Sequence, residues 1–78
     1  MNQYKLEKGM SEVEHSMGVK YINIYHTTTN QKIVSIFSDQ MIRFTDKTEH
    51  WFSLSELKMI QDIANNFQVI YNAINEEN

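Results

Sequence analysis

The sequence predicts a single α+β domain: a three- or four-stranded antiparallel β-meander with one long C-terminal amphipathic helix packed across it. Two observations predict this class. Over residues 19–52, short runs rich in β-branched and aromatic residues alternate with polar turns, which is typical of an antiparallel sheet. Residues 53–75 instead repeat apolar side chains at three- and four-residue steps, the pattern of a helix with one buried face. A chain of 78 residues has room for one domain, so residues 1–78 are expected to fold together.

The sheet is expected to begin at residue 19. The expected strands are 19–26, 32–37 and 41–45, with residues 50–52 as the fourth strand of the larger sheet, and the expected turns are 27–31, 38–40 and 46–49. In the first strand, Ile22 and Ile24 share one face, while Tyr21 and Tyr25 share the other. The first 18 residues are less regular. Their two glycines predict turns, and the alternation over 13–17 favours a short strand, so we expect a partly ordered segment.

The C-terminal helix carries the clearest local signal. Ser53 and Glu56 have the spacing of a capping box, in which each side chain bonds a backbone N–H of the other residue. Lys58 and Asp62 add an ion pair one turn apart. The apolar stripe of this helix consists of Leu57, Ile60, Ile63, Ala64, Phe67, Ile70, Tyr71 and Ile74.

The length of this helix predicts an interface. A helix of about 22 residues measures roughly 33 Å, whereas strands of five or six residues span only about 17–20 Å. The first half would therefore cover the sheet, and the apolar side chains of the second half would need another surface. We expect homodimerisation or docking of a protein partner through Phe67, Val69, Ile70, Tyr71 and Ile74.

Composition argues against several classes of protein. The chain has no cysteine, which excludes disulfides and thiolate chemistry. No apolar run is long enough to cross a bilayer, so a cytoplasmic protein without a membrane partner is expected. The net charge of −3 lacks the basic excess that is common among nucleic-acid-binding proteins.

No catalytic or metal-binding motif is present. His15, His26 and His50 are not spaced as zinc ligands from one helix face. With two glycines in the chain, neither a nucleophile elbow nor a glycine-rich phosphate loop can be identified. We therefore expect a protein that is not an enzyme and that needs no cofactor or metal.

The aromatic residues allow two interpretations. Phe37, Phe44 and Trp51 could belong to the core, as large aromatic side chains commonly do. Alternatively, they could share an exposed sheet face with Tyr21 and Tyr25 and stack on the bases of a single-stranded nucleic acid. The cations expected around such a face are Lys20, Lys32, Arg43 and Lys47.

Several antiparallel strands followed by one C-terminal helix, over residues 19–75, resemble the family of transcriptional coactivators that bind single-stranded DNA. The resemblance is one of element pattern and includes no individual motif residue. It implies a dimer formed through sheet and helix. The negative net charge departs from the basic binding face of that family.

Together these features predict a small non-enzymatic protein that binds or inhibits another protein. The many Asn, Ile and Lys residues indicate an A/T-rich genome, and a phage-encoded inhibitor of a host enzyme or defence protein would fit. Its working surface would be Tyr21, Tyr25 and Trp51, or the second half of the helix. The alternative is a single-stranded nucleic-acid-binding protein that uses the aromatic sheet face.

Overall fold

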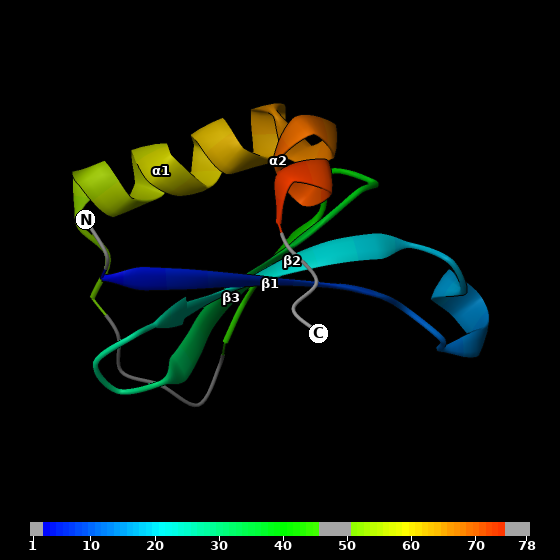
Figure 1. The fold of residues 1–78 in the computed structure, drawn as a ribbon, viewed down its shortest axis with the longest axis horizontal. Helices are drawn as coiled ribbons and strands as arrows, with labels where there is room; N and C mark the ends of the chain where they lie inside the picture. The colour runs from blue at the N-terminus through cyan, green and yellow to red at the C-terminus, as the bar shows by residue number, and fades with distance from the viewer. Residues whose placement is uncertain (1–2, 46–50, 75–78) are drawn as a thin grey trace.

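A four-stranded antiparallel sheet carries two helices on one of its faces (Figure 1). The computed structural model describes residues 3–45 and 51–74. The strands are β1 (Tyr4–Met10), β2 (Lys20–His26), β3 (Gln31–Phe37) and β4 (Ile42–Phe44), and they lie side by side in chain order. The helices are α1 (Leu54–Asn65) and α2 (Phe67–Ala73), and a short 3-10 helix, η1 (Glu14–Ser16), lies between β1 and β2. Every neighbouring pair of strands is antiparallel, so the predicted class is confirmed.

One strand comes from the segment that was expected to be only partly ordered. β1 pairs with β2 along its whole length, from Tyr4 opposite His26 to Met10 opposite Lys20. The alternation over 13–17 forms η1 and not a strand, so that prediction was wrong. In the expected fourth strand, residue 50 lies outside the described residues and residues 51 and 52 are not in a strand.

The core lies between the sheet and the helices. Ile22 and Ile24 of β2 have no exposed surface, and they face Ile60 and Ile63 of α1 in one cluster of buried residues. The remaining buried apolar residues of this cluster are Ile33, Val34 and Ile36 of β3. Side chains alternate along a strand, so burial of the two isoleucines places the odd-numbered side chains of β2 on the sheet face away from the helices.

The predicted single helix is broken at Asn66. The backbone there has φ −118° and ψ 34°, and the Asn66 side-chain amide donates to the Asp62 carbonyl at 2.9 Å. Asparagine favours such breaks because its side chain competes with helical backbone hydrogen bonds. α2 consequently turns sharply away from the direction of α1 (Figure 1), and its apolar residues pack against the same core.

Several local signals of the sequence are confirmed, whereas Gly9, where a turn was predicted, lies inside β1. Asn30 and Gln40 have positive φ values, 57° and 73°, within two of the three predicted turns. Ser53 and Glu56 form both hydrogen bonds of the capping box. Lys58 and Asp62 form the expected ion pair at 3.4 Å.

Burial of Ile24 should dominate the stability of the sheet. We expect Ile24→Ala to lower the free energy of unfolding by about 2–5 kcal/mol, because it leaves a cavity beneath α1. Val69→Ala is the control, since Val69 is 70% exposed and should change stability by less than about 0.5 kcal/mol. Urea denaturation of both variants measures the difference. Equal effects would contradict the assigned core.

Candidate functional site

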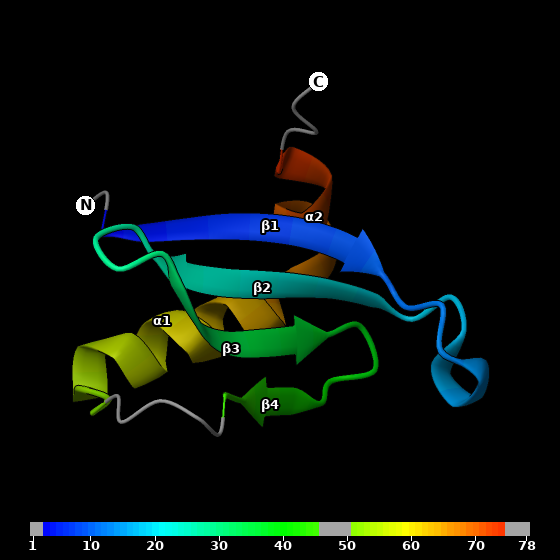
Figure 2. The ribbon, with the colours of Figure 1, turned by 90° about the horizontal axis from the view of Figure 1, so that it is seen from below.

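The sheet face opposite the helices is covered by no helix of the described residues (Figure 2). We call it the open face. We assign residues to this face from the register of the four strands and from the lining of a hollow on this side. They are Lys5, Glu7, Gly9, Tyr21, Asn23, Tyr25, Lys32, Ser35, Phe37, Arg43 and Thr45.

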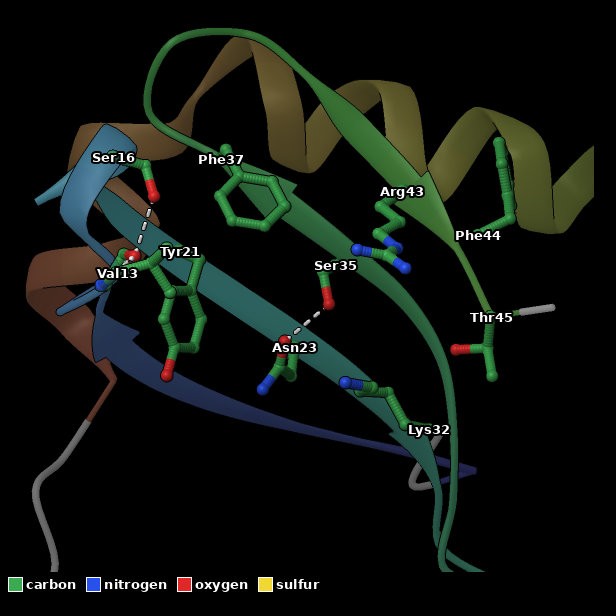
Figure 3. A pocket seen from close by; sticks show the side chains of 11 residues that line it. Val13, Ser16, Tyr21, Asn23, Lys32, Ser35, Phe37, Arg43, Phe44 and Thr45 are labelled. Carbon is green, nitrogen blue, oxygen red and sulfur yellow. Dashed lines mark hydrogen bonds between the residues drawn. The ribbon is translucent and has the colours of Figure 1, made fainter. Parts of the chain in front are cut away.

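A hollow of about 680 Å³ lies on the open face (Figure 3). Ser11, Val13 and Ser16, from the loop that contains η1, line one end of it. The strands contribute Tyr21, Asn23, Lys32, Ser35, Phe37, Arg43, Phe44 and Thr45. The lining therefore combines aromatic rings, hydroxyl groups, one amide and two cations, and it contains no carboxylate.

The Tyr21 ring lies over the backbone of β1. A Cβ atom placed on Gly9 would lie 2.5 Å from the Tyr21 ring carbon Cζ, so the missing side chain of Gly9 makes room for the ring. The Phe37 ring stands beside it, with ring centroids 5.8 Å apart and planes tilted by 55°. One face of Tyr21 thus rests on the sheet, and the other is left for a ligand.

The centre of the open face is polar and ordered. The Ser35 hydroxyl donates to Asn23 Oδ1 at 2.7 Å (Figure 3). Burial, followed by the charge of Glu7, raises the pKa of Tyr25. Lys5 Nζ lies 3.5 Å from the Glu7 carboxylate and 5.6 Å from the centre of the Tyr25 ring. Lys5 therefore neutralises Glu7 on the β1 side, while the positive charge of the hollow comes from β3 and β4.

The structure brings together part of the predicted nucleic-acid set. Tyr21, Lys32 and Arg43 line the hollow, and Tyr25 shares their face. Lys20 lies on the helix side, with its Nζ atom 5.3 Å from the centre of the Tyr71 ring. Lys47 lies outside the described residues, as do His50 and the predicted turn at 46–49.

The interpretation that places Phe37, Phe44 and Trp51 in the core is wrong. Phe37 is half-buried on the open face beside Tyr21, and Phe44 is 46% exposed. Trp51 is 91% exposed in the segment that leads into α1. The core is built from isoleucine and valine instead.

The predicted interface residues of the helix are divided between two environments. Four of them, Phe67, Ile70, Tyr71 and Ile74, are half-buried and pack against the core of their own chain. Val69 is 70% exposed. The break at Asn66 accounts for the burial of the four, because it folds the second half of the stripe back onto the sheet instead of letting it extend beyond it. Val69 is not part of the stripe and remains exposed.

Gly9, Asn23 and Ser35 were missed as members of the site. The alternation of β2 placed Asn23 beside the two tyrosines, but its contact with Ser35 depends on the register between β2 and β3. Gly9 could be assigned to the site only after β1 was identified as a strand of the sheet. The available signal was the alternation in β1, where apolar Tyr4 and Leu6 enclose Lys5.

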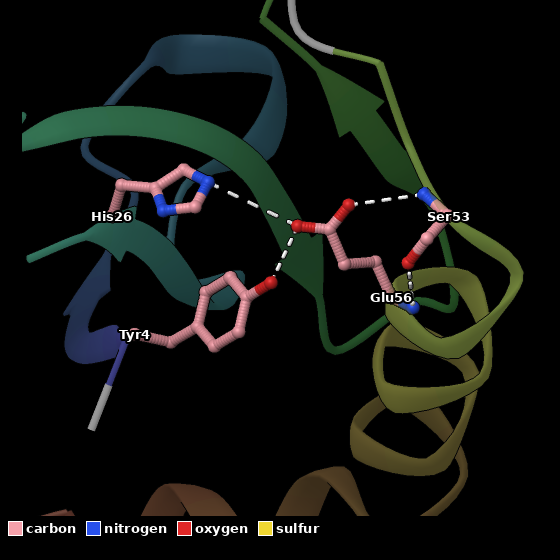
Figure 4. Close-up of polar contacts among 4 residues, drawn as sticks. All are labelled: Tyr4, His26, Ser53 and Glu56. Carbon is pink, nitrogen blue, oxygen red and sulfur yellow. Dashed lines mark hydrogen bonds and ion pairs between the residues drawn. The ribbon is translucent and has the colours of Figure 1, made fainter. Parts of the chain in front are cut away.

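A second polar cluster joins β1, β2 and α1 (Figure 4). The Glu56 carboxylate accepts a hydrogen bond from the Tyr4 hydroxyl and another from the Ser53 N–H, and it lies 3.9 Å from His26 Nε2. Burial, together with the hydrogen bond and the charge of Glu56, raises the pKa of Tyr4 to about 12. Because Glu56 is also part of the capping box, this cluster anchors the start of α1 to the sheet.

Residues 3–45 and 51–74 contain no group of three or more His, Asp or Glu side chains that could hold a metal ion. No helix in this part of the chain is both long enough and apolar enough to cross a membrane. No family model, curated protein or solved structure matches the chain.

The Tyr4–Glu56 hydrogen bond should make stability depend on pH. The folded state holds the Tyr4 proton more tightly than the unfolded chain, whose tyrosine pKa is about 10. The stabilisation is therefore complete below pH 10 and is lost as the pH rises through about 12. We expect Tyr4→Phe to be less stable than the wild type at pH 8, and the difference to disappear toward pH 12. Denaturation at several pH values measures it, and a constant difference would contradict the assignment.

Gly9→Ala should displace the Tyr21 ring without unfolding the protein, because the ring is the far end of a flexible side chain. We expect altered Tyr21 ring resonances in NMR spectra while the melting transition stays cooperative. Gly18→Ala is a poor control, since Gly18 has φ 84° and would be strained. Ser55→Ala, on the exposed side of α1, is a suitable one. Unchanged Tyr21 resonances in Gly9→Ala would contradict the contact.

Proposed function

We propose that this protein is a non-enzymatic binding protein that holds single-stranded nucleic acid on its open face. One observation carries the proposal: the rings of Tyr21 and Phe37 line the same hollow as Lys32 and Arg43, and no carboxylate lines it. An uncovered sheet with aromatic rings and cations is suited to a strand that presents bases and phosphates alternately.

Each component of the hollow matches a component of a nucleotide. Aromatic rings stack on bases of any sequence, and such a contact contributes about 1–3 kcal/mol per base. The guanidinium of Arg43 can bind a phosphate through two parallel hydrogen bonds or stack on a base. The Asn23 amide has donors and an acceptor of the kind that bind base edges. Ser35 orients this amide through the bond at 2.7 Å.

The distribution of charge reconciles this proposal with the net charge of −3. Glu56 is engaged by Tyr4 and Ser53 on the helix side, and Asp62 is paired with Lys58. Glu7 is on the open face but pairs with Lys5 outside the hollow. The hollow itself is positive. With two cations it should contact about two phosphates, so affinity should fall with salt at a logarithmic slope of about −1.4.

Fluorescence anisotropy with short labelled DNA and RNA oligonucleotides tests the proposal. We expect Tyr21→Ala to weaken binding about 5- to 150-fold through loss of stacking. Arg43→Glu should weaken binding by a similar factor and reduce the salt dependence. Lys20→Glu is the charge-matched control, because Lys20 lies on the helix side over Tyr71 and should leave affinity nearly unchanged.

Two results would contradict the proposal. One is the absence of oligonucleotide binding by the folded wild-type protein at low salt. The other is an equal loss of affinity for Lys20→Glu and Arg43→Glu, which would mean that binding depends on total charge and not on the open face.

A second candidate function is the binding or inhibition of a protein, for which a phage-encoded inhibitor of a host enzyme or defence protein is the concrete form. The exposed apolar residues at the start of α1 favour it, since Trp51 is 91% and Leu54 is 85% exposed. Tryptophan is among the residues enriched at the energetic centres of protein interfaces. A partner isolated with the wild type should be lost with Trp51→Ala and retained with Tyr21→Ala if this surface is used.

A further inference from the structure

We propose that two copies of the chain associate through the outer edges of their β1 strands and join their sheets into one continuous antiparallel sheet. This inference concerns a surface other than the open face and does not depend on its ligand. β1 lies at one end of the strand order, and in the described part of the chain only β2 pairs with it. Its seven residues make it the longer of the two edge strands.

The outer edge presents backbone hydrogen-bonding groups at alternate residues. The Thr27 N–H donates to the Gln3 carbonyl at 3.0 Å, and the Ser11 N–H donates to the Val19 carbonyl at 2.8 Å. The odd-numbered residues between Gln3 and Ser11 therefore bond to β2. In an antiparallel ladder the residues between them direct their N–H and C=O groups to the other side. Along β1 these are the even-numbered residues, which include Tyr4, Leu6 and Lys8.

Among the symmetric registers centred between Lys5 and Lys8, the charges along β1 favour one. With the two-fold axis at Leu6, Lys5 of one copy lies opposite Glu7 of the other, and this pair occurs twice. Axes at Lys5, Glu7 or Lys8 would each place a residue opposite a like charge, which is destabilising in cross-strand pairs. The register at Leu6 also pairs residues whose backbone groups point outward, Leu6 with Leu6 and Tyr4 with Lys8. The strand is therefore complementary to a second copy of itself.

The lysines of β1 do not obstruct this edge. Edge lysines commonly prevent sheet association by extending into the space that a second strand would occupy. Here Lys8 Nζ lies 4.9 Å from the centre of the Tyr71 ring, and Lys5 Nζ lies above the Tyr25 ring. Both side chains thus fold onto their own chain. α2 projects past the β1 edge (Figure 2), so the segment that the sequence predicted to form an interface borders this one.

Charge exchange tests the register. By light scattering on a sizing column, we expect the wild type to elute as a dimer. Glu7→Lys places like charges in both cross-strand pairs and should raise the dissociation constant about tenfold or more. The double variant Lys5→Glu with Glu7→Lys restores opposite charges and should restore the dimer. Glu14→Lys makes the same charge change in η1, away from the edge, and should remain dimeric.

A cross-link tests the position of the axis. The chain has no cysteine, so a single introduced cysteine can pair only between copies. At a hydrogen-bonded pair the Cα atoms are about 5.5 Å apart, within the range that a disulfide spans. Leu6→Cys should therefore form a covalent dimer under mild oxidation. Met10→Cys, four residues from the axis on the same strand, should not.

A wild-type protein that stays monomeric at high concentration would overturn the proposal. So would a dimer that Glu7→Lys leaves intact, or one that Met10→Cys cross-links as readily as Leu6→Cys. Circular dichroism of each variant ensures that a loss of mass reflects dissociation of folded chains.

Discussion

The burial of Ile22 and Ile24 beneath α1 is the interaction on which the rest of the structure depends. Both residues have no exposed surface, and they lie in a strand that is paired on both edges. Because side chains alternate along a strand, their burial turns Tyr21, Asn23 and Tyr25 toward the open face. The candidate site is thus a direct consequence of the packing of the core. A change of register by one residue would exchange the two faces of the strand, and it would remove both the core packing and the candidate site.

The break at Asn66 determines how this small domain covers its core. An unbroken helix would have carried Phe67, Ile70 and Tyr71 beyond the sheet. The break lets α2 fold back onto the core, so Tyr71 packs near β1. The Tyr71 hydroxyl donates to the Gly9 carbonyl at 3.4 Å, and the Tyr71 ring lies beneath Lys8. The same turn that completes the core therefore supports the strand whose outer edge we propose as the dimer interface.

Local features of the sequence were predictable where the residues themselves specify the backbone. The alternation over β2, the turns at Asn30 and Gln40 and the capping box at Ser53 all depend on near neighbours. β1 was missed because Lys8 interrupts the alternation of Tyr4 and Leu6 on the helix side. Only the fold shows that the Lys8 stem and charge lie over an aromatic ring of α2.

The candidate site was predictable in part. Tyr21 and Tyr25 were placed on one face by alternation alone, and Lys32 and Arg43 were among the expected cations. Membership of Phe37 and Ser35 depends on the register of β3, which no local signal defines. Lys20, in contrast, could have been excluded by the alternation of β2, because it shares the face of Ile22 and Ile24. The aromatic residues led to a wrong prediction. Phe44 and Trp51 are of residue types that are common in cores, but both are exposed.

The most direct test is a titration of ¹⁵N-labelled protein with a short single-stranded oligonucleotide, followed by two-dimensional NMR. If the open face binds nucleic acid, the largest shifts will occur at Tyr21, Asn23, Ser35 and Arg43, while amides along α1 will change little. Shifts concentrated at Trp51 and Leu54, or no shifts at low salt, would contradict the proposed function.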